Sequence, residues 1–169
     1  MKIKDIIFEF KHQNYKNFDT FYRLTERQVY FAIVTISKDQ DVTKDLMQDT
    51  YMKFIEKIDQ FNDQLSVYAY LTTIGRNLAI NEYNRRKRDI HDEQIFDYIP
   101  SPNKVDENEG ILDILDTLDD IKRDIVVMHV INDLKFREIA KVLTMPLGTV
   151  QWHYHEAIKI LKEKVGDVL

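Results

Sequence analysis

The chain of 169 residues contains no cysteine, only four glycines and three prolines, and no long uninterrupted apolar run. Without cysteine, disulfide bonds and thiolate chemistry are excluded. A membrane-spanning helix needs about 20 apolar residues, so no membrane insertion is expected. The charged N-terminus (MKIKDIIFEFKHQNYK) lacks the apolar core of a signal peptide, and the expected compartment is the cytoplasm. Because turn-forming residues are few and helical patterns are long, the sequence predicts an all-α protein.

Acidic residues outnumber basic ones, but they are distributed unevenly. The net charge of −5 arises from residues 92–120, which carry −9, whereas residues 1–91 and 121–169 carry +2 each. The mildly basic flanks remain compatible with nucleic-acid binding. Prolines and acids also interrupt the helical periodicity, which predicts a flexible acidic linker over residues 92–110. An alternative role for this segment is an acidic mimic that covers a basic surface of the unbound chain.

The linker divides the chain into two small helical domains, residues 1–91 and 111–169. Apolar periodicity predicts helices over residues 18–36, 42–58 and 66–89 in the first domain. In the second domain it predicts helices near residues 111–118, 121–131 and 135–143, and a last helix that ends near residue 165. A polar loop over residues 59–66 holds one aromatic residue, Phe61.

The predicted helix over residues 66–89 combines an apolar stripe with a basic, amide-rich and aromatic surface. Arginines neutralise phosphates, amides read base edges, and aromatic rings stack on unpaired bases, so this surface suits nucleic acid. The alternative is a solvated helix end that carries a Lys/Arg run. The candidate contacts are Tyr70, Arg76, Asn77, Asn81, Arg85, Arg86 and Arg88.

Residues 136–154 (FREIAKVLTMPLGTVQWHY) fit a helix-turn-helix. Ile139 and Val150 occupy packing positions, and Pro146 suits the first turn of the second helix, where an N–H is not needed. In this motif the second helix enters the major groove and its N-terminal half contacts bases. Those residues are Thr149, Gln151, Trp152 and His153. The alternatives are a helical hairpin with no DNA role and, for Trp152, a packing role.

The order of these segments resembles the sigma factors of bacterial RNA polymerase, in particular the short two-domain extracytoplasmic-function type. The resemblance covers nearly the whole chain. Asp45-Leu46-Met47-Gln48-Asp49 matches the D-L-x-Q-E/D pattern of region 2 in that family. Tyr70, Leu71, Ile74, Gly75, Arg76 and Asn77 match its aromatic-Leu-x-x-Ile-small-Arg-Asn segment. The helix-turn-helix corresponds to region 4.

The resemblance implies an alternative sigma factor that binds core RNA polymerase and directs promoter recognition and melting. It implies polymerase contacts by Asp45, Leu46, Gln48 and Asp49. The minus-10 element would be bound by the basic helix together with Phe61, whose loop resembles one that receives a flipped base. The minus-35 element would be bound by Thr149, Gln151, Trp152 and His153. The implied partners are core polymerase, promoter DNA and, in many relatives, an anti-sigma factor. No cofactor, metal, small-molecule substrate or enzymatic activity is expected.

The last helix departs from the family pattern on its DNA face. Gln151, Trp152 and His153 replace the usual Lys-Ser-Arg, and Glu156 adds a negative charge. Each lost phosphate contact should lower affinity and reduce the salt dependence of binding. A second hypothesis is therefore an auxiliary or competitor protein that binds core polymerase but reads promoters poorly. A third, an ordinary helix-turn-helix regulator, leaves the residue 45–49 pattern and the basic helix unexplained.

Overall fold

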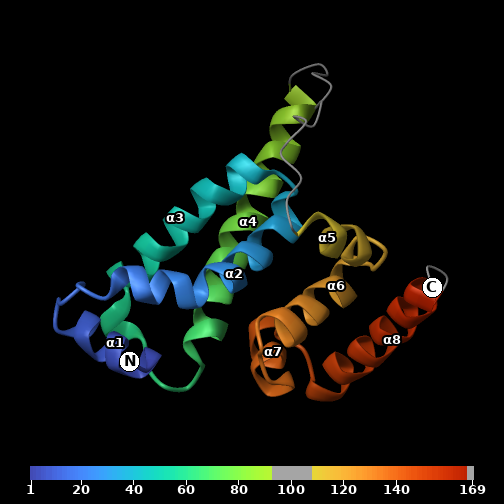
Figure 1. The fold of residues 1–169 in the computed structure, drawn as a ribbon. Coiled ribbons are helices and arrows are strands. Elements are labelled where there is room, and N and C mark those ends of the chain that lie inside the picture. Colours follow the sequence, from blue (N-terminus) through green and yellow to red (C-terminus); the bar gives the residue numbers. More distant parts are fainter. Residues whose placement is uncertain (93–107, 167–169) are drawn as a thin grey trace.

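The computed structural model describes residues 1–92 and 108–166, and every regular element in these ranges is helical. Two helical bundles lie side by side, as Figure 1 shows. The first consists of α1 (Ile3–Lys11), α2 (Phe18–Ser37), α3 (Gln40–Glu56), the 3-10 turn η1 (Ile58–Gln60) and α4 (Val67–Asp92). The second consists of α5 (Glu109–Leu115), α6 (Asp120–Val126), the π-helical turn η2 (Val127–Ile131), α7 (Phe136–Leu143) and α8 (Leu147–Gly166). The predicted all-α architecture is confirmed.

Aspartates define the start of one helix in each bundle. Asp39 precedes α3, and its Oδ1 accepts a hydrogen bond from the backbone N–H of Val42 at 3.0 Å. Asp119 precedes α6, and its Oδ1 accepts from the N–H of Lys122 at 2.9 Å. Such a cap satisfies an N–H group that has no partner inside the helix, and it stabilises a helix by about 1 kcal/mol. The sequence therefore specifies these boundaries locally.

Aromatic rings fill the core of the first bundle. Phe10, Phe21 and Phe54 are fully buried, and the rings of Phe21 and Phe54 stack with centroids 5.2 Å apart. α4 approaches α2 closely at Gly75, where an added Cβ would lie 3.2 Å from Cγ1 of Ile33. The small residue at this position of the sequence motif thus allows the two helices to pack against each other.

α7 and α8 form the predicted helix-turn-helix. Ile139 and Val150 are fully buried, in agreement with the packing positions that the sequence indicates. The turn contains Thr144 in the left-handed region with φ 52°. The carbonyl of Pro146 accepts hydrogen bonds from the N–H groups of Thr149 and Val150, both at 3.1 Å. Pro146 therefore stands at the start of α8, where the sequence places it.

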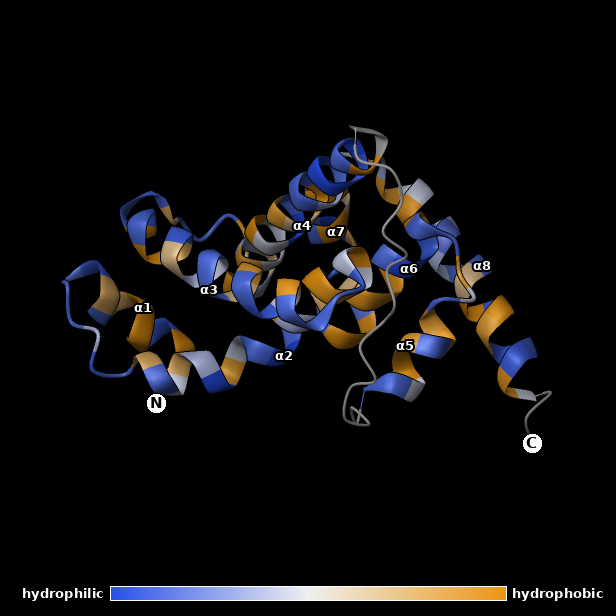
Figure 2. Cartoon of the chain, turned by 90° about the horizontal axis from the view of Figure 1, so that it is seen from above, coloured by the Kyte–Doolittle hydropathy of each residue, from blue (hydrophilic) through white to orange (hydrophobic). Residues whose placement is uncertain are grey.

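Two apolar clusters join the bundles across α2 and α4. Phe31 and Val34 of α2 belong to a cluster with four buried residues of the second bundle that precede α7, namely Leu115, Leu118, Val126 and Val127. Ala69 of α4 belongs to a second cluster with Ile125, Met128, Leu134, Ile139 and Val150. The N-terminal half of α4 thus lies in the interface, whereas its C-terminal part is predominantly hydrophilic (Figure 2).

The sequence analysis does not predict α1, because charges interrupt its apolar residues and the helix is short. Ile6, Ile7 and Phe10 are nevertheless buried and belong to the core of the first bundle. α1 therefore covers one end of this bundle.

The expected linker, residues 92–110, lies mostly outside the described residues. The described chain resumes at Asn108, just before α5. Within residues 1–92 and 108–166, none of the helices has the length and apolar composition that a membrane crossing requires.

Candidate functional site

α4 presents three different faces along its length. One face packs into the first bundle through buried Leu71 and Ala79. A second face, with Thr72 and Arg76, contacts the second bundle. The third face is an exposed polar stripe at spacings of four, three and four residues. It consists of Asn77, Asn81, Asn84 and Arg88, and Lys87 borders it. This amide stripe can present hydrogen-bond donors and acceptors to nucleic acid.

The amide stripe agrees in part with the contacts expected from the sequence. Asn77, Asn81 and Arg88 lie on it, as predicted. Asn84 and Lys87 were missed, although the helical spacing from Asn77 and Asn81 could have identified Asn84.

Arg76 lies in the interface between the bundles. Its Nη2 donates to Oδ2 of Asp124 at 2.8 Å and its Nε donates to the same oxygen at 3.3 Å. The two side chains are only 21% and 15% exposed. Burial raises the pKa of Asp124 above its usual value, although the Arg76 charge acts in the opposite direction. Arg76 was predicted to contact DNA, but in this arrangement its guanidinium is bound to Asp124.

A second polar contact reinforces the same interface. Nδ2 of the fully buried Asn132 donates to Oγ1 of Thr72 at 2.8 Å. Six residues before Thr72, the backbone N–H of Ser66 donates to Oε1 of Glu138 at 3.0 Å. Glu138 is partly desolvated, but the hydrogen bonds that it accepts from Ser66 and Lys135 hold its pKa below the usual value. These hydrogen bonds between polar groups therefore help to fix the position of the two bundles relative to each other.

Arg85 and Arg86 of α4 form ion pairs within the first bundle. Arg85 binds Glu82 at 2.7 Å and Asp89 at 3.0 Å. Arg86 binds Glu82 at 3.0 Å and lies 3.6 Å from Asp39. The hydrogen bond from Arg85 is the main cause of the lowered pKa of Glu82. The side chains of Arg85 and Arg86 are 57% and 41% exposed, so phosphates can reach them from solvent.

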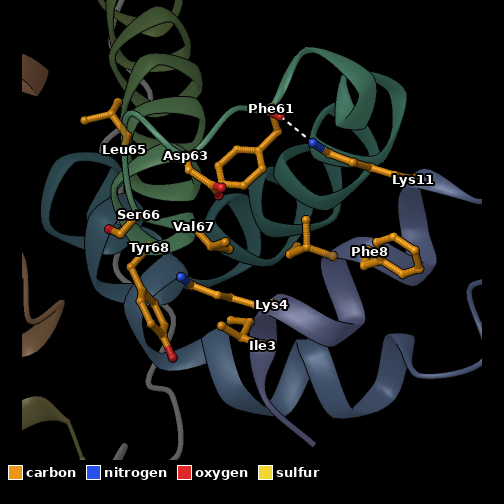
Figure 3. Close-up of a pocket in the computed structure, with 11 residues that line it drawn as sticks. Ile3, Lys4, Phe8, Lys11, Phe61, Asp63, Leu65, Ser66, Val67 and Tyr68 are labelled. Atoms are coloured by element: carbon orange, nitrogen blue, oxygen red, sulfur yellow. Dashed lines mark hydrogen bonds between the residues drawn. The ribbon is translucent and has the colours of Figure 1, made fainter.

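Phe61 was expected to contact the minus-10 element, and the structure places it in the core of the first bundle. It is 5% exposed, and its ring packs against Phe54 and Tyr70 with centroids 6.1 and 5.3 Å away. Lys11 of α1 donates to the Phe61 carbonyl at 2.7 Å. The same loop borders a recess of about 510 Å³ that α1 also lines, and Figure 3 shows Lys11 reaching the Phe61 carbonyl there. Phe61 therefore anchors the loop in the core and does not offer a free stacking surface, whereas Tyr70 is half-buried beside it.

α3 presents the acidic face that the sequence predicts. Asp45, Gln48 and Asp49 are all exposed on it. Leu46, which was also expected to contact the polymerase, is 8% exposed and belongs to the core. Next to Gln48 lies an apolar groove of about 540 Å³, lined by Phe18, Tyr22, Gln48, Tyr51, Met52, Ile55 and Glu56. Met52 is 61% exposed at its edge, so this groove offers apolar surface to a partner.

On the recognition helix α8, only some of the residues that were expected to contact DNA are exposed. Thr149, Gln151 and Trp152 are exposed. His153, which was also expected to contact DNA, is half-buried, and its Nδ1 has no access to solvent. It lies near Asp119, whose pKa is lowered mainly by hydrogen bonds from Lys122 and in part by the His153 charge. His155, which was not among the expected contacts, is exposed instead.

Comparison with known proteins adds an independent observation. The family model Sigma-70 region 2 matches residues 21–89, and the model Sigma-70, region 4 matches residues 108–161. The chain belongs to the extracytoplasmic-function sigma factors. Region 2 of this sigma factor thus spans α2 to α4, and region 4 spans α5 to most of α8, while α1 precedes the matched residues.

Individual relatives of this sigma factor are distant in sequence but similar in extent. The sigma factor SigX of Bacillus subtilis (strain 168) is 22% identical over 165 residues, which cover 88% of this chain and 83% of SigX. EcfG of Rhodopseudomonas palustris (strain TIE-1) is 26% identical over 132 residues, covering 75% and 72% of the two chains. The sigma factor RpoE from Bartonella quintana, solved with the anti-sigma factor NepR, has the same fold with a TM-score of 0.73. It is 22% identical, and the match covers 89% of this chain and 98% of RpoE.

Proposed function

We propose that this chain is an alternative sigma factor that binds core RNA polymerase and directs it to a particular set of promoters. In this role α4 contacts the minus-10 element, α8 contacts the minus-35 element, and the polymerase performs the chemistry in the cytoplasm. The observation that carries the proposal is the pair of exposed polar faces on α4 and α8 within a chain of this family.

The amide stripe of α4 suits single-stranded promoter DNA. Asparagine side chains both donate and accept hydrogen bonds, so they can bind the edges of unpaired bases. Arg85, Arg86 and Arg88 lie one to three turns further along the helix, where they can neutralise phosphates. The half-buried ring of Tyr70 lies at the other end of this face, and an aromatic ring stabilises a stacked base by about 1–3 kcal/mol.

The described arrangement of the two bundles cannot read both promoter elements at once. The elements are centred roughly 25 base pairs apart, which corresponds to about 85 Å at 3.4 Å per base pair. In the structure, by contrast, α4 and α6 are in direct contact through Arg76 and Asp124 at 2.8 Å. We infer that regions 2 and 4 separate when the chain engages a promoter, and that the structure represents a closed form.

The exposed face of α3 is the proposed polymerase-binding surface. Asp45, Gln48 and Asp49 remain accessible in the closed form, and the apolar groove lies next to them. A polymerase can therefore dock on region 2 before regions 2 and 4 separate. A related sigma factor was solved with an anti-sigma factor, and an inhibitor of this kind could cover the same face of this chain.

A binding measurement tests the α3 surface. Core polymerase is titrated against the full chain and against a variant in which Asp45, Gln48 and Asp49 are replaced by alanine. We expect the triple variant to bind at least tenfold more weakly. Asp113→Ala, which removes an exposed carboxylate on α5, is the matched control and should bind like the wild type. Equal affinity of the triple variant and the wild type would show that the polymerase binds elsewhere.

A further inference from the structure

The recognition helix α8 has a buried side and an exposed side that the structure distinguishes residue by residue. Val150 and Ala157 are fully buried and mark the side that faces the rest of region 4. Gln151, Trp152 and His155 are exposed, and Lys159 follows His155 one turn later on the same side. Trp152 is 57% exposed, which is unusual for so large an apolar side chain.

His153 and His155 therefore have different surroundings although they are two residues apart. The Nδ1 atom of His153 is buried and has no hydrogen-bond partner, and its ring lies 4.9 Å from that of Trp152 in an edge-to-face contact. His153 thus supports the position of Trp152 from the side of α6. His155 is exposed, so its ring is accessible to a base edge.

We propose that Gln151, Trp152 and His155 are the base-reading residues of region 4, that they select A·T pairs in the minus-35 duplex, and that His153 is a positioning residue. This inference rests on the proposed function, since it concerns what the DNA-binding face of α8 recognises. It replaces the expected pair Trp152–His153 by a set that shares one face of the helix.

The chemistry of the three side chains carries the preference for A·T pairs. A glutamine amide can donate to N7 and accept from N6 of adenine in a bidentate contact. The exposed apolar surface of Trp152 can pack on the C5-methyl group that only thymine presents in the major groove. A ring N–H of His155 can donate to O4 of thymine in the same groove.

The absence of arginine from this face supports the same preference. Arginine bound to guanine is the most common specific contact in the major groove. Residues 147–158 contain no lysine or arginine, so α8 offers no such contact to guanine in its first three turns. Lys159 lies about 12 Å along the helix from Gln151, at 1.5 Å per residue, where it can bind a phosphate. Recognition by α8 thus depends on shape and hydrogen bonds more than on charge.

The test is a selection with the complete holoenzyme. Core polymerase is reconstituted with the full chain, and a promoter pool with a randomised minus-35 element is selected by transcription and sequenced. We expect the wild type to enrich A·T pairs at two or more adjacent positions. Gln151→Ala, Trp152→Ala and His155→Phe should each reduce the enrichment at one position, roughly 5- to 100-fold for loss of a specific base contact.

His153→Phe is the matched control because it receives the same substitution as His155 and keeps the ring against which Trp152 packs. It should enrich the same sequences as the wild type, whereas His153→Ala, which removes that ring, should weaken the enrichment at the position that Trp152 reads. Selection of G·C-rich elements would overturn the inference, and so would a changed preference in His153→Phe with none in His155→Phe.

If the chain is not a sigma factor, the selection gives a different result. In that case the chain does not bind core polymerase, or the complex transcribes no member of the pool. A complex that binds and transcribes, but selects no minus-35 sequence, contradicts only the inference about α8.

Discussion

Replacing Asp124 with alanine should shift this chain from the closed form towards a form with separated bundles. In the closed form Arg76 donates two hydrogen bonds to one Asp124 oxygen, at 2.8 and 3.3 Å, and the two side chains are 21% and 15% exposed. The alanine variant leaves the guanidinium in the interface without this partner. In the open form water can solvate the guanidinium, so the substitution raises the free energy of the closed form selectively.

The size of the effect follows from two opposing contributions. Burial raises the pKa of Asp124 despite the nearby Arg76 charge, so desolvation of the carboxylate offsets much of the attraction between the two groups. Loss of one partner nevertheless leaves a partly buried charge unpaired, which typically costs about 1–3 kcal/mol. We therefore expect the ratio of closed to open molecules to fall by roughly 5- to 150-fold. Asp124→Asn keeps an oxygen acceptor and should have a smaller effect.

The raised pKa of Asp124 also predicts how the closed form depends on pH. The closed form binds the proton of this carboxyl more tightly than the open form, in which the group is solvated. The contribution of Asp124 therefore favours closure below its ordinary pKa, and this contribution is lost as pH rises through the raised value. The Asp124→Asn variant should lack this part of the pH dependence.

Energy transfer between two dyes measures the separation directly. The chain has no cysteine, so Lys44→Cys on α3 and Lys162→Cys on α8 provide exposed labelling sites on the two bundles. We expect Asp124→Ala to reduce the high-transfer population of the labelled chain. Lys38→Ala is the control, because Lys38 and Asp116 form an ion pair between the bundles that is 55% and 52% exposed and contributes little. The reasoning is refuted if Asp124→Ala and the labelled wild type give the same distribution.

Substitutions at three further positions test the packing and the polar contacts. Gly75→Leu should lower the free energy of unfolding by about 3 kcal/mol in chemical denaturation, because Ile33 and Thr50 leave no room for it. Gly75→Ala should change it by less than about 1 kcal/mol, since its helix propensity offsets the tight contact. Thr144→Gly should raise the melting temperature, because a β-branched residue at φ 52° costs about 1 kcal/mol relative to glycine; an unchanged or lower value would contradict this. Glu138→Gln should lower stability by about 1 kcal/mol at pH 7 and by progressively less as the pH falls below the ordinary glutamate pKa. The lowered pKa of Glu138 makes its contribution present above the ordinary glutamate value and lost as pH falls through the lowered one, so a loss that does not change with pH would contradict the assignment.

Local patterns were sufficient to predict most of the fold. The helices over α2, α3, α4, α7 and α8 follow from apolar residues at helical spacing, and the helix-turn-helix follows from Ile139, Pro146 and Val150. α1 was missed because a nine-residue helix with charges between its apolar residues has a weak periodic signal. Its burial depends on contacts with the rest of the bundle, which no local pattern contains.

The candidate site was predicted less completely, for reasons that differ from residue to residue. Leu46 lies within the motif that was expected to bind the polymerase, but its side chain packs in the core. Which residues of α3 face the core depends on how this helix is rotated against the rest of the bundle. The ion-pair partner of Arg76 is Asp124, which is 48 residues away in the sequence and lies in the second bundle. His153 is half-buried and His155 is exposed, because the face that a residue occupies depends on how α8 packs on α6. The residue types thus indicated which side chains could take part in binding. Whether each side chain is exposed or buried could be seen only in the folded structure.

The central claim is that this chain supplies promoter recognition to RNA polymerase. The most direct measurement combines the purified chain with core polymerase and maps the start sites of transcription on genomic fragments from its host. The account predicts discrete start sites that core polymerase alone does not use, with a common element at the minus-10 position. Stable binding to the polymerase without new start sites would contradict a sigma factor that reads promoters and would favour a competitor or auxiliary protein. Absence of binding would contradict both roles.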